Sequence, residues 1–529
     1  MGAIARAYND WYRIHREALE DVLDRKDHTL GNALTAEVVR YSHLRNHVLS
    51  DKAYRSDVII ACDDDGELDP LAETMICDYF AENPQVNMLY CDEDRVEEDG
   101  VHLDPWFKPE WSPDTFLSGF YFGNIFAIRS AALAMINPGG RSAANFESAS
   151  AQREDLLNEE KARLNMESNP MRSWIYEKLC LKLAQADGGF SRRPEQEWDI
   201  FPVGHIPEIL FHMEEKVQTW SGNLITESLT GRYDRASALL RLISIVIPSK
   251  DNPEMLARCV RSIEGNTSVP HEIIIVDNGS TPENRAKVQK LVDELNEDGR
   301  VLYLYEEMPF NMPRFYNLGA AAASGEMLLF MHDDVIIQTK GWLSHLSEKA
   351  KLPYVGAVGM KLLYPNSNII EHAGIISVEE GPVYKLQYCR NDESYYFDFN
   401  KGVRNVLALS GACIMVRGEI FREVGGFDEE HFPNYGGNMD FCYRIFEKGY
   451  YNVVRNNMYL YYYESYSPEN GATREERELH RPMEIRILQE RHPKLARRDP
   501  FYHQYLTQDV REPKFKVELS RTGVPQDER

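Results

Sequence analysis

The stretch that decides the fold is GEMLLFMHDDV, residues 325–335. Residues 327–331 are all apolar, which is typical of a strand that is buried on both faces. His332 follows, and then two carboxylates stand side by side, Asp333 and Asp334. We expect this pair to lie at the end of a core strand, where a ligand can use it.

Strand patterns and helix patterns alternate in the sequence around this stretch. LISIVIP (242–248) and HEIIIVDNGS (271–280) are strand patterns, and PEMLARCVRSI (253–263) between them has apolar residues at helical spacing. Such alternation predicts crossover units and a parallel sheet covered by helices on both faces. Ligands of such sheets bind at the carboxyl ends of the strands, where Asp277 and the Asp333 and Asp334 pair are expected.

The first half of the chain repeats the pattern in DVIIACDDDGELDP (57–70), an apolar run that ends in three carboxylates. This indicates a distant internal duplication. We expect a first module over 1–212, a polar linker over 213–241, a second module over 242–470, and a carboxy-terminal helix with an extended tail over 471–529.

Composition excludes several classes of protein. The 529 residues carry a formal net charge of -25, which repels nucleic acid. The apolar runs are too short to span a bilayer, and the amino terminus is an amphipathic helix pattern without a signal-peptide core. The eight cysteines are scattered, as in reduced cytosolic proteins. We therefore expect a cytoplasmic protein, with docking at the inner face of the plasma membrane left open.

Two explanations compete for the paired carboxylates. Carboxylates at a strand end can hold a hard cation such as Mn²⁺ or Mg²⁺, which also binds phosphate oxygens. Alternatively, Asp333 caps the following helix, because Asp is a favoured amino-terminal cap. The pair alone does not decide between them.

Several motifs in order resemble one known family. They are ISIVIPSKDNPEMLARCVRSI (243–263), HEIIIVDNGS, FNMPRFYNLGAAAASGEMLLFMHDDV (310–335), EHAGI (371–375), LSGACIMVRGEIFREVGGFDEE (409–430) and NMDFCYRI (438–445). The second half resembles the family 2 glycosyltransferases, inverting enzymes that move a sugar from a nucleotide diphosphate to an acceptor hydroxyl. The resemblance implies an α/β, Rossmann-like GT-A fold with a mixed, mostly parallel sheet. It also points to bacterial two-module enzymes that build rhamnose-rich or other surface polysaccharides.

The resemblance also implies roles for individual residues. Asp334 would ligate the metal, Asp333 would reach the ribose, and Asp277 would accept a hydrogen bond from a pyrimidine ring. The nucleotide site would be completed by Pro248, Ser249, Asn278, Arg314 and Asn317. The sugar and acceptor pocket would be shaped by Trp342, His372 and Gly411, although Trp342 and His372 can equally be core residues.

One expected group is missing from the second module. Inverting transfer needs a general base at the acceptor hydroxyl. In the family pattern a carboxylate stands where this chain has Asn438, and an amide is no useful base. Asp440 matches the second, supporting Asp of the pattern. Either Asp440 has taken over, or the module transfers slowly or not at all.

The first half resembles the same family over a shorter span. Asp63 and Asp65 match the metal motif. We expect no first or second strand before residue 57, and SWIYEKLCLKL (173–183) stands where the base motif belongs. We therefore interpret the first module as truncated or degenerate, a scaffold or an acceptor-binding surface.

The leading hypothesis is a metal-dependent transferase that uses a UDP or dTDP sugar and a growing, lipid-linked or free glycan as acceptor. The alternative is a catalytically impaired, transferase-like module that binds a glycan or assembles with an active transferase. A nucleotidyltransferase is disfavoured, because no glycine-rich phosphate loop with an activating Lys follows LISIVIP.

Overall fold

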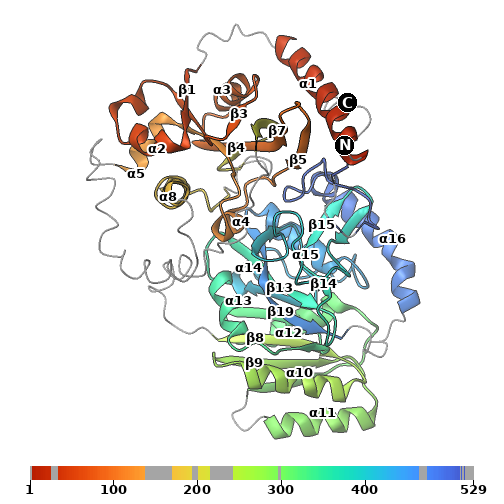
Figure 1. Cartoon of the computed structure of the whole chain (residues 1–529). Helices are drawn as coiled ribbons and strands as arrows, with labels where there is room; N and C mark the ends of the chain where they lie inside the picture. The colour runs from red at the N-terminus through yellow and green to blue at the C-terminus, as the bar shows by residue number, and fades with distance from the viewer. Residues whose placement is uncertain are drawn as a thin grey trace.

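The computed structural model describes residues 3–25, 34–137, 170–186, 188–192, 201–214, 242–295, 300–463, 474–512, 514 and 517–518. These residues form two sheet-based modules joined through a wide interface (Figure 1). Of the linker expected over 213–241, only residues 213 and 214 are described.

The second module is built on a sheet of ten strands among the described residues, in the order β10-β9-β8-β11-β18-β13-β19-β12, with β14 and β17 at its margins. The expected strands β8, β9, β10 and β11 are parallel to one another, and β18 runs antiparallel to both β11 and β13. All residues of β8 and β11 are buried, which explains their continuous apolar sequence. The strands of this sheet are β8 (Ile243–Ser249), β9 (His271–Asp277), β10 (Val301–Tyr305), β11 (Met327–Met331), β12 (Val335–Ile336), β13 (Val355–Leu363), β14 (Ile370–His372), β17 (Val403–Val406), β18 (Cys413–Arg417) and β19 (Tyr451–Tyr462). A separate two-stranded sheet is formed by β15 (Ile375–Val378) and β16 (Gly381–Tyr384).

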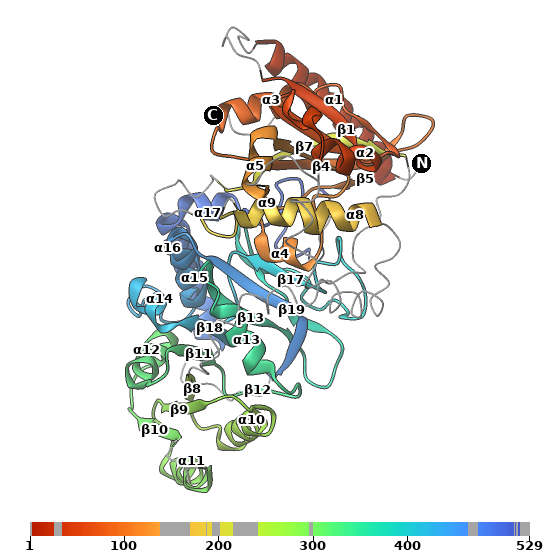
Figure 2. The same cartoon turned by 90° about the vertical axis from the view of Figure 1, so that its left-hand side faces the viewer.

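Helices cover both faces of this sheet (Figure 2). On one face α10 contacts α11, and the indole of Trp342 in α13 donates to Thr267 Oγ1 beyond the end of α10. On the other face, the first turns of α12 and α15 meet where Pro313 touches Gly437. The helices are α10 (Pro253–Asn266), α11 (Pro282–Leu295), α12 (Met312–Ala322), α13 (Trp342–Ala350), α14 (Gly418–Glu423), α15 (Gly437–Glu447), α16 (Arg474–Arg491) and α17 (Pro493–Arg497).

The first module repeats the central part of this sheet. Its strand order is β1-β2-β6-β4-β7-β3, with β5 paired to β4, and each pair runs in the same relative direction as β8-β11-β18-β13-β19-β12 with β14. The elements are α1 (Ala3–Arg25), β1 (Ala36–Arg40), α2 (Tyr41–Val48), β2 (Val58–Cys62), β3 (Gly66–Leu68), α3 (Ala72–Glu82), β4 (Met88–Val96), β5 (His102–Trp106), α4 (Pro113–Ser118), β6 (Ile125–Arg129), α5 (Leu133–Ile136), α8 (Pro170–Trp174), a π-helical turn (Ile175–Cys180), α9 (Leu181–Ala186) and β7 (Gly204–Met213).

One expectation about the first module is wrong. A first strand does precede residue 57, because β1 pairs with β2 as β8 pairs with β11. The sequence did not predict β1, because AEVVR is a short edge strand with only one buried residue, Val39. In the described residues α2 follows β1 directly, so nothing there corresponds to α10, β9, α11 and β10.

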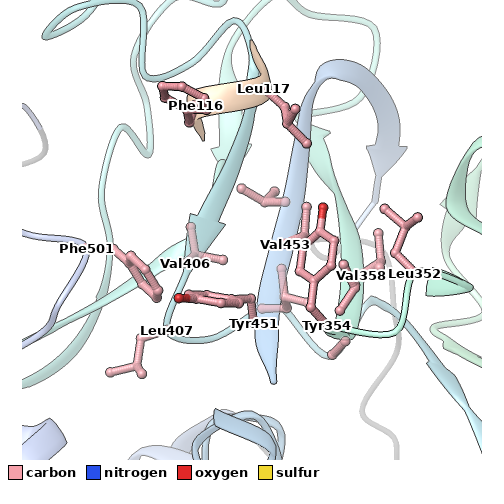
Figure 3. Packing of buried hydrophobic residues seen from close by; sticks show 14 of the residues in the cluster. Phe116, Leu117, Leu352, Tyr354, Val358, Val406, Leu407, Tyr451, Val453 and Phe501 are labelled. Atoms are coloured by element: carbon pink, nitrogen blue, oxygen red, sulfur yellow. The ribbon is translucent and has the colours of Figure 1, made fainter. Parts of the chain in front are cut away.

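A buried polar cluster joins the two modules. Asp114 in α4 accepts hydrogen bonds from Lys349 Nζ (2.7 Å) and Asn405 Nδ2 (2.9 Å), and all three side chains are buried. Asn405 Oδ1 in turn accepts from the backbone N–H of Asp114 (2.8 Å), so a residue of the second module caps a helix of the first. Around this cluster Phe116 and Leu117 pack over the second module's core (Figure 3).

Strand β4 carries three consecutive carboxylates with no exposed surface, Asp92, Glu93 and Asp94. Each is matched by a cation or a donor. Asp92 binds His205 and His503 (both 3.0 Å), Glu93 lies 3.4 Å from Lys108 Nζ, and Asp94 binds His102 (2.8 Å) and His212 (2.6 Å). Buried charges persist only with such partners.

These carboxylates hold both ends of the described chain against the first module. Tyr8 in α1 donates to Asp94 Oδ2 (2.7 Å), and His503 of the carboxy-terminal segment binds Asp92. Trp11 and Tyr505 meet ring to ring, with 4.8 Å between centroids. A small hydrophobic core lies here, made of Tyr8, Trp11, Tyr12, Phe107, Ile209, Ile376, Val378, Tyr502 and Leu506.

We predict that Lys349→Met lowers the free energy of unfolding by about 3 to 5 kcal/mol, because it leaves Asp114 buried without its cation. Urea unfolding measures this. The matched control is Arg13→Met, which removes the exposed Arg13 and Glu17 pair and should cost less than about 1 kcal/mol. Equal effects of the two substitutions would contradict the buried-charge argument.

We also predict that the protein loses stability between pH 6.5 and pH 9. Burial alone would lower the pKa of His205 and of His212, but Asp92 and Glu110 raise the first, and Asp69 and Asp94 the second, to about 9. A histidine whose folded pKa is raised stabilises fully below its unfolded value of 6.5 and loses this contribution as pH rises through about 9.

The loss should reach roughly 2 to 3 kcal/mol for each histidine. Urea unfolding of wild type, His205→Gln and His212→Gln across this pH range measures it. The variants should start less stable and show a flatter profile, and a wild-type slope that both variants retain would refute the assignment.

Candidate active site

The acidic pair lies at the carboxyl end of β11, as expected. Asp333 and Asp334 are each 2% exposed. Asp333 Oδ2 accepts hydrogen bonds from Ser249 Oγ (2.7 Å), at the end of β8, and from Asn252 Nδ2 (3.3 Å), at the start of α10. Burial and the neighbouring charge of Asp334 raise the pKa of Asp333 to about 7. Two carboxylates this close and this buried favour a cation between them.

The end of β9 lies beside this pair. Asp277 Oδ1 accepts the backbone N–H groups of Gly279 (3.1 Å) and Ser280 (2.8 Å), in a turn for which Gly279 supplies a φ of +106°. Its Oδ2 accepts the Tyr303 hydroxyl (2.5 Å). Asn278 is 2% exposed, and its Nδ2 finds no hydrogen-bond partner among the described residues. This buried donor is suited to a ligand carbonyl.

Pro248, Arg314 and Asn317, the other expected nucleotide-site residues, have separate surroundings. Pro248 is buried within β8 beside Ser249. Arg314, in the first turn of α12, is half exposed and lies 3.6 Å from Glu306. Asn317 is partly exposed and fixes the chain after α14, because its amide exchanges hydrogen bonds with the backbone of Phe427.

A second group gathers at the start of α15. Asn438 Nδ2 donates to Leu409 O (2.6 Å). A Cβ placed on Gly411 would lie 3.8 Å from both the Asn438 side chain and His332 Nε2, so these three residues line one space. His332 Nδ1 shares a hydrogen bond with the Tyr462 hydroxyl (3.0 Å). The structure therefore brings Asn438 and Gly411 close to His332, which directly precedes the acidic pair.

Asp440 lies outside this space, in a buried ion-pair cluster. Its Oδ1 accepts from Arg491 (2.9 Å) and His492 (3.2 Å), and its Oδ2 accepts from Arg444 (2.8 Å). Burial would raise the pKa of Asp440, but His492 and the two arginines lower it. A fully buried carboxylate with both oxygens engaged is poorly placed to accept a proton from a substrate, so the geometry argues against Asp440 as the base.

His372 and Trp342 have separate environments. His372 is buried, its Nε2 accepts the Ser410 N–H (3.3 Å) next to Gly411, and burial lowers its pKa to about 3, so it is neutral. Trp342 is fully buried against Thr267, beyond the carboxy-terminal end of α10, whereas Asn252 at the opposite end of α10 reaches Asp333. The structure does not bring Trp342 to the acidic pair.

Three matching hydrogen bonds align the acidic motif of the first module with that of the second. The backbone N–H of Asp63 donates to Asn124 O, as that of His332 donates to Ala412 O. The backbone N–H of Glu214 donates to Asp65 O, as that of Tyr463 donates to Asp334 O. The hydroxyl of Tyr41 donates to Gly123 O, as that of Tyr316 donates to Gly411 O.

In the first module an arginine of the same chain binds at the position that corresponds to this space. Arg172 in α8 donates to Asp63 Oδ2 and to Asn124 Oδ1. Asp64 accepts from Ser42 Oγ (2.5 Å), and Asp65, the counterpart of Asp334, is exposed. An arginine therefore occupies the space that Asn438 borders in the second module.

Sequence reasoning missed four residues of the site, namely Asn252, Tyr303, Tyr316 and His332, and it did not predict the contact of His332 with Tyr462. His332 directly follows an expected strand and Asn252 directly precedes an expected helix, so their position was a usable signal. Tyr303 and Tyr316 reach the site only through the packing of β10 and α12, which no local pattern reveals.

The fold and the acidic strand end together define a GT-A glycosyltransferase domain. The family model for glycosyl transferase family 2 matches residues 244–425. This match lies within the second module and confirms the resemblance seen in its motifs.

Relatives extend this likeness to both modules. The O-antigen biosynthesis protein RfbC of Myxococcus xanthus is 29% identical over 79% of this chain and 32% of its own length. The uncharacterized protein y4gI of Sinorhizobium fredii is 29% identical over 80% of this chain and 45% of its own length. The chain thus spans less than half the length of either relative.

Solved structures show a weaker likeness. A mannosyltransferase from Pyrobaculum calidifontis in complex with GDP-Man and Mn²⁺ is 14% identical, with a TM-score of 0.33 over 44% of this chain and 59% of that one. Separately, within the described residues we find no helix with the length and apolarity that crossing a membrane requires.

We predict that Asp334→Asn stabilises the ion-free protein while abolishing Mn²⁺ binding. The pKa of Asp333 is raised in the folded state, so its ionisation lowers the stability of the fold as the pH rises towards that pKa. Replacing Asp334 removes the neighbouring negative charge and therefore restores part of this stability. At pH 8 the gain should be about 1 kcal/mol in urea unfolding, and calorimetry should detect no Mn²⁺ association.

The matched control is Glu307→Gln, which removes an exposed charge near Gly279 at the same sheet edge. It should change neither measurement appreciably. Undiminished Mn²⁺ binding by Asp334→Asn would exclude this carboxylate as a ligand.

Proposed function

We propose that the second module transfers a sugar from a nucleotide-diphosphate donor to a hydroxyl of a glycan acceptor. The observation that carries the proposal is the buried pair of Asp333 and Asp334 at the end of β11, inside a family 2 domain. The pair shares its sheet edge with the buried amide of Asn278, so acidic and hydrogen-bonding groups converge on one edge, as donor binding requires.

Asp334, with Asp333 beside it, is the proposed ligand for Mn²⁺ or Mg²⁺. Carboxylate oxygens are the donors that these hard cations prefer. When bound, the cation supplies charge neutralisation for the departing diphosphate. The raised pKa of Asp333 supports this assignment, because a divalent ion would relieve the repulsion that raises it.

The nucleoside is proposed to bind at the end of β9. Asn278 Nδ2 is a buried donor suited to a base carbonyl, and Asp277 is an acceptor suited to a ring N–H. These are the groups of a pyrimidine, which favours a UDP or dTDP sugar. Asp277 Oδ2 now accepts the Tyr303 hydroxyl, so the base would have to displace Tyr303.

Inverting transfer requires the acceptor oxygen to attack the anomeric carbon opposite the diphosphate while a base removes its proton. Asn438 occupies the position of that base and donates its amide to Leu409 O. It can position an acceptor but cannot take its proton. The chain's own residues therefore support donor binding more strongly than rapid transfer.

This difference favours a second candidate function, a catalytically impaired module that binds a glycan or assembles with an active transferase. Asn438 and the enclosed Asp440 support it. The first module fits a non-catalytic scaffold, because Arg172 binds Asp63 and no described element corresponds to β9 and β10.

Surface-polysaccharide synthesis is the proposed setting, with a growing and lipid-linked glycan as acceptor. Its support is the likeness to an O-antigen biosynthesis protein across both modules.

We predict that Asn438→Asp accelerates turnover. Restoring a carboxylate beside Gly411 would supply the missing base, and general bases contribute about 10²-fold or more. Release of nucleoside diphosphate from a panel of UDP and dTDP sugars with Mn²⁺ measures this, with water as acceptor where no glycan is added.

Asp334→Asn should abolish release by wild type and by Asn438→Asp alike. Asp440→Asn is the matched comparison on the same helix, and it should lower stability more than turnover, because it breaks the contacts with Arg444, Arg491 and His492. Donor binding without turnover in wild type and Asn438→Asp would favour the glycan-binding alternative, and no donor binding at all would refute both donor assignments.

A further inference from the structure

Tyr388 stands out on the surface of the second module. It is 69% exposed, the highest value among the exposed large hydrophobic side chains of the described residues. An aromatic ring that is this exposed offers an apolar face on which a ligand can stack.

The backbone holds Tyr388 in this exposed position. Leu386 and Tyr388 both have a φ of +66°, a left-handed conformation that is strained for bulky side chains. Leu386 and Cys389 are buried, and the Tyr388 N–H donates to Ile370 O (2.8 Å), so the turn is anchored on both sides of the exposed ring. Strain of this kind persists where the surrounding structure imposes it, and often at functional sites.

The ring of Tyr388 extends a flat aromatic surface. It stacks on Tyr364, with centroids 5.5 Å apart and planes only 7° from parallel. Gln387 Nε2 donates to the Tyr364 hydroxyl (3.1 Å). Glu371, on β14, is 2% exposed, and it contributes, after burial and Tyr388, to raising the pKa of Tyr364. The result is an exposed aromatic ring with an amide beside its stacking partner.

This arrangement matches the chemistry of a sugar. One face of a pyranose presents C–H groups with partial positive charge, which pack on the negative face of an aromatic ring. The hydroxyl groups at the sugar's edge need a polar group beside the ring, and the partly exposed side-chain amide of Gln387 provides one. We propose that Tyr364 and Tyr388 form a binding platform for the acceptor glycan.

The platform connects to the candidate active site through β14. Ile370, which anchors Tyr388, lies two residues before His372, or about 6.6 Å along the strand. His372 accepts the N–H of Ser410, the residue before Gly411. The proposal rests on the proposed transferase function and names where the chain of an acceptor extends beyond the reacting sugar.

The experiment measures glycan binding and donor binding in the same preparations of full-length protein. The probe for the platform is a microarray of purified bacterial O-polysaccharides and their repeat-unit oligosaccharides. The probe for the donor site is calorimetry with UDP and dTDP in Mn²⁺. The variants are Tyr388→Gly, Tyr388→Phe and Tyr364→Ala, with Met483→Ala as an exposed hydrophobic control elsewhere on the second module.

Tyr388→Gly should bind array glycans about five- to tenfold more weakly while its melting temperature stays at or above that of wild type, because glycine relieves the strained φ. Tyr388→Phe keeps the ring and should bind nearly as wild type. Tyr364→Ala should weaken binding as well, and Met483→Ala should not. Donor binding should be the same in all four variants.

Two results would overturn the proposal, namely a wild type that binds no array glycan and a Tyr388→Gly variant that binds as well as wild type. Failure of the transferase function is a separate result, because it appears as absent nucleotide binding whatever the glycan array shows.

Discussion

The placement of two adjacent carboxylates in a nearly water-free position is the constraint on which the second module depends. Asp333 and Asp334 lie where β8, β9 and β11 end together, and Ser249 and Asn252 provide hydrogen bonds that offset only part of their burial. A purely structural pair at this depth would be replaced by apolar residues at a gain in stability. Retaining it is best explained by a ligand that the fold is shaped to receive.

The comparison of the modules shows how one sheet supports two outcomes. The strands from β1 to β7 repeat those from β8 to β19, including the hydrogen bonds that flank the acidic motif. In the first module Arg172 neutralises Asp63 from within the chain, whereas the equivalent space in the second is bordered by Gly411 and Asn438. The same arrangement of strands thus carries an internal arginine contact in one copy and a glycine and an amide in the other.

Much of the second module could be predicted from sequence, because β8 to β11 are continuous apolar runs and their ends carry Asp277 and Asp333. The edge strand β1 could not, since AEVVR buries little. The partners of Asp440 could not either, because Arg491 and His492 belong to elements some 50 residues later. Long-range ion pairing leaves no local signal, and it decides whether a carboxylate is structural or reactive.

The buried carboxylates of β4 have a consequence for how the protein is made. Asp92 is neutralised by His205 and by His503, which lies close to the far end of the described chain. Domains usually fold in order of their emergence from the ribosome. Here His503 becomes available to Asp92 only after the whole second module has been translated, so the first module cannot complete its closure before that point.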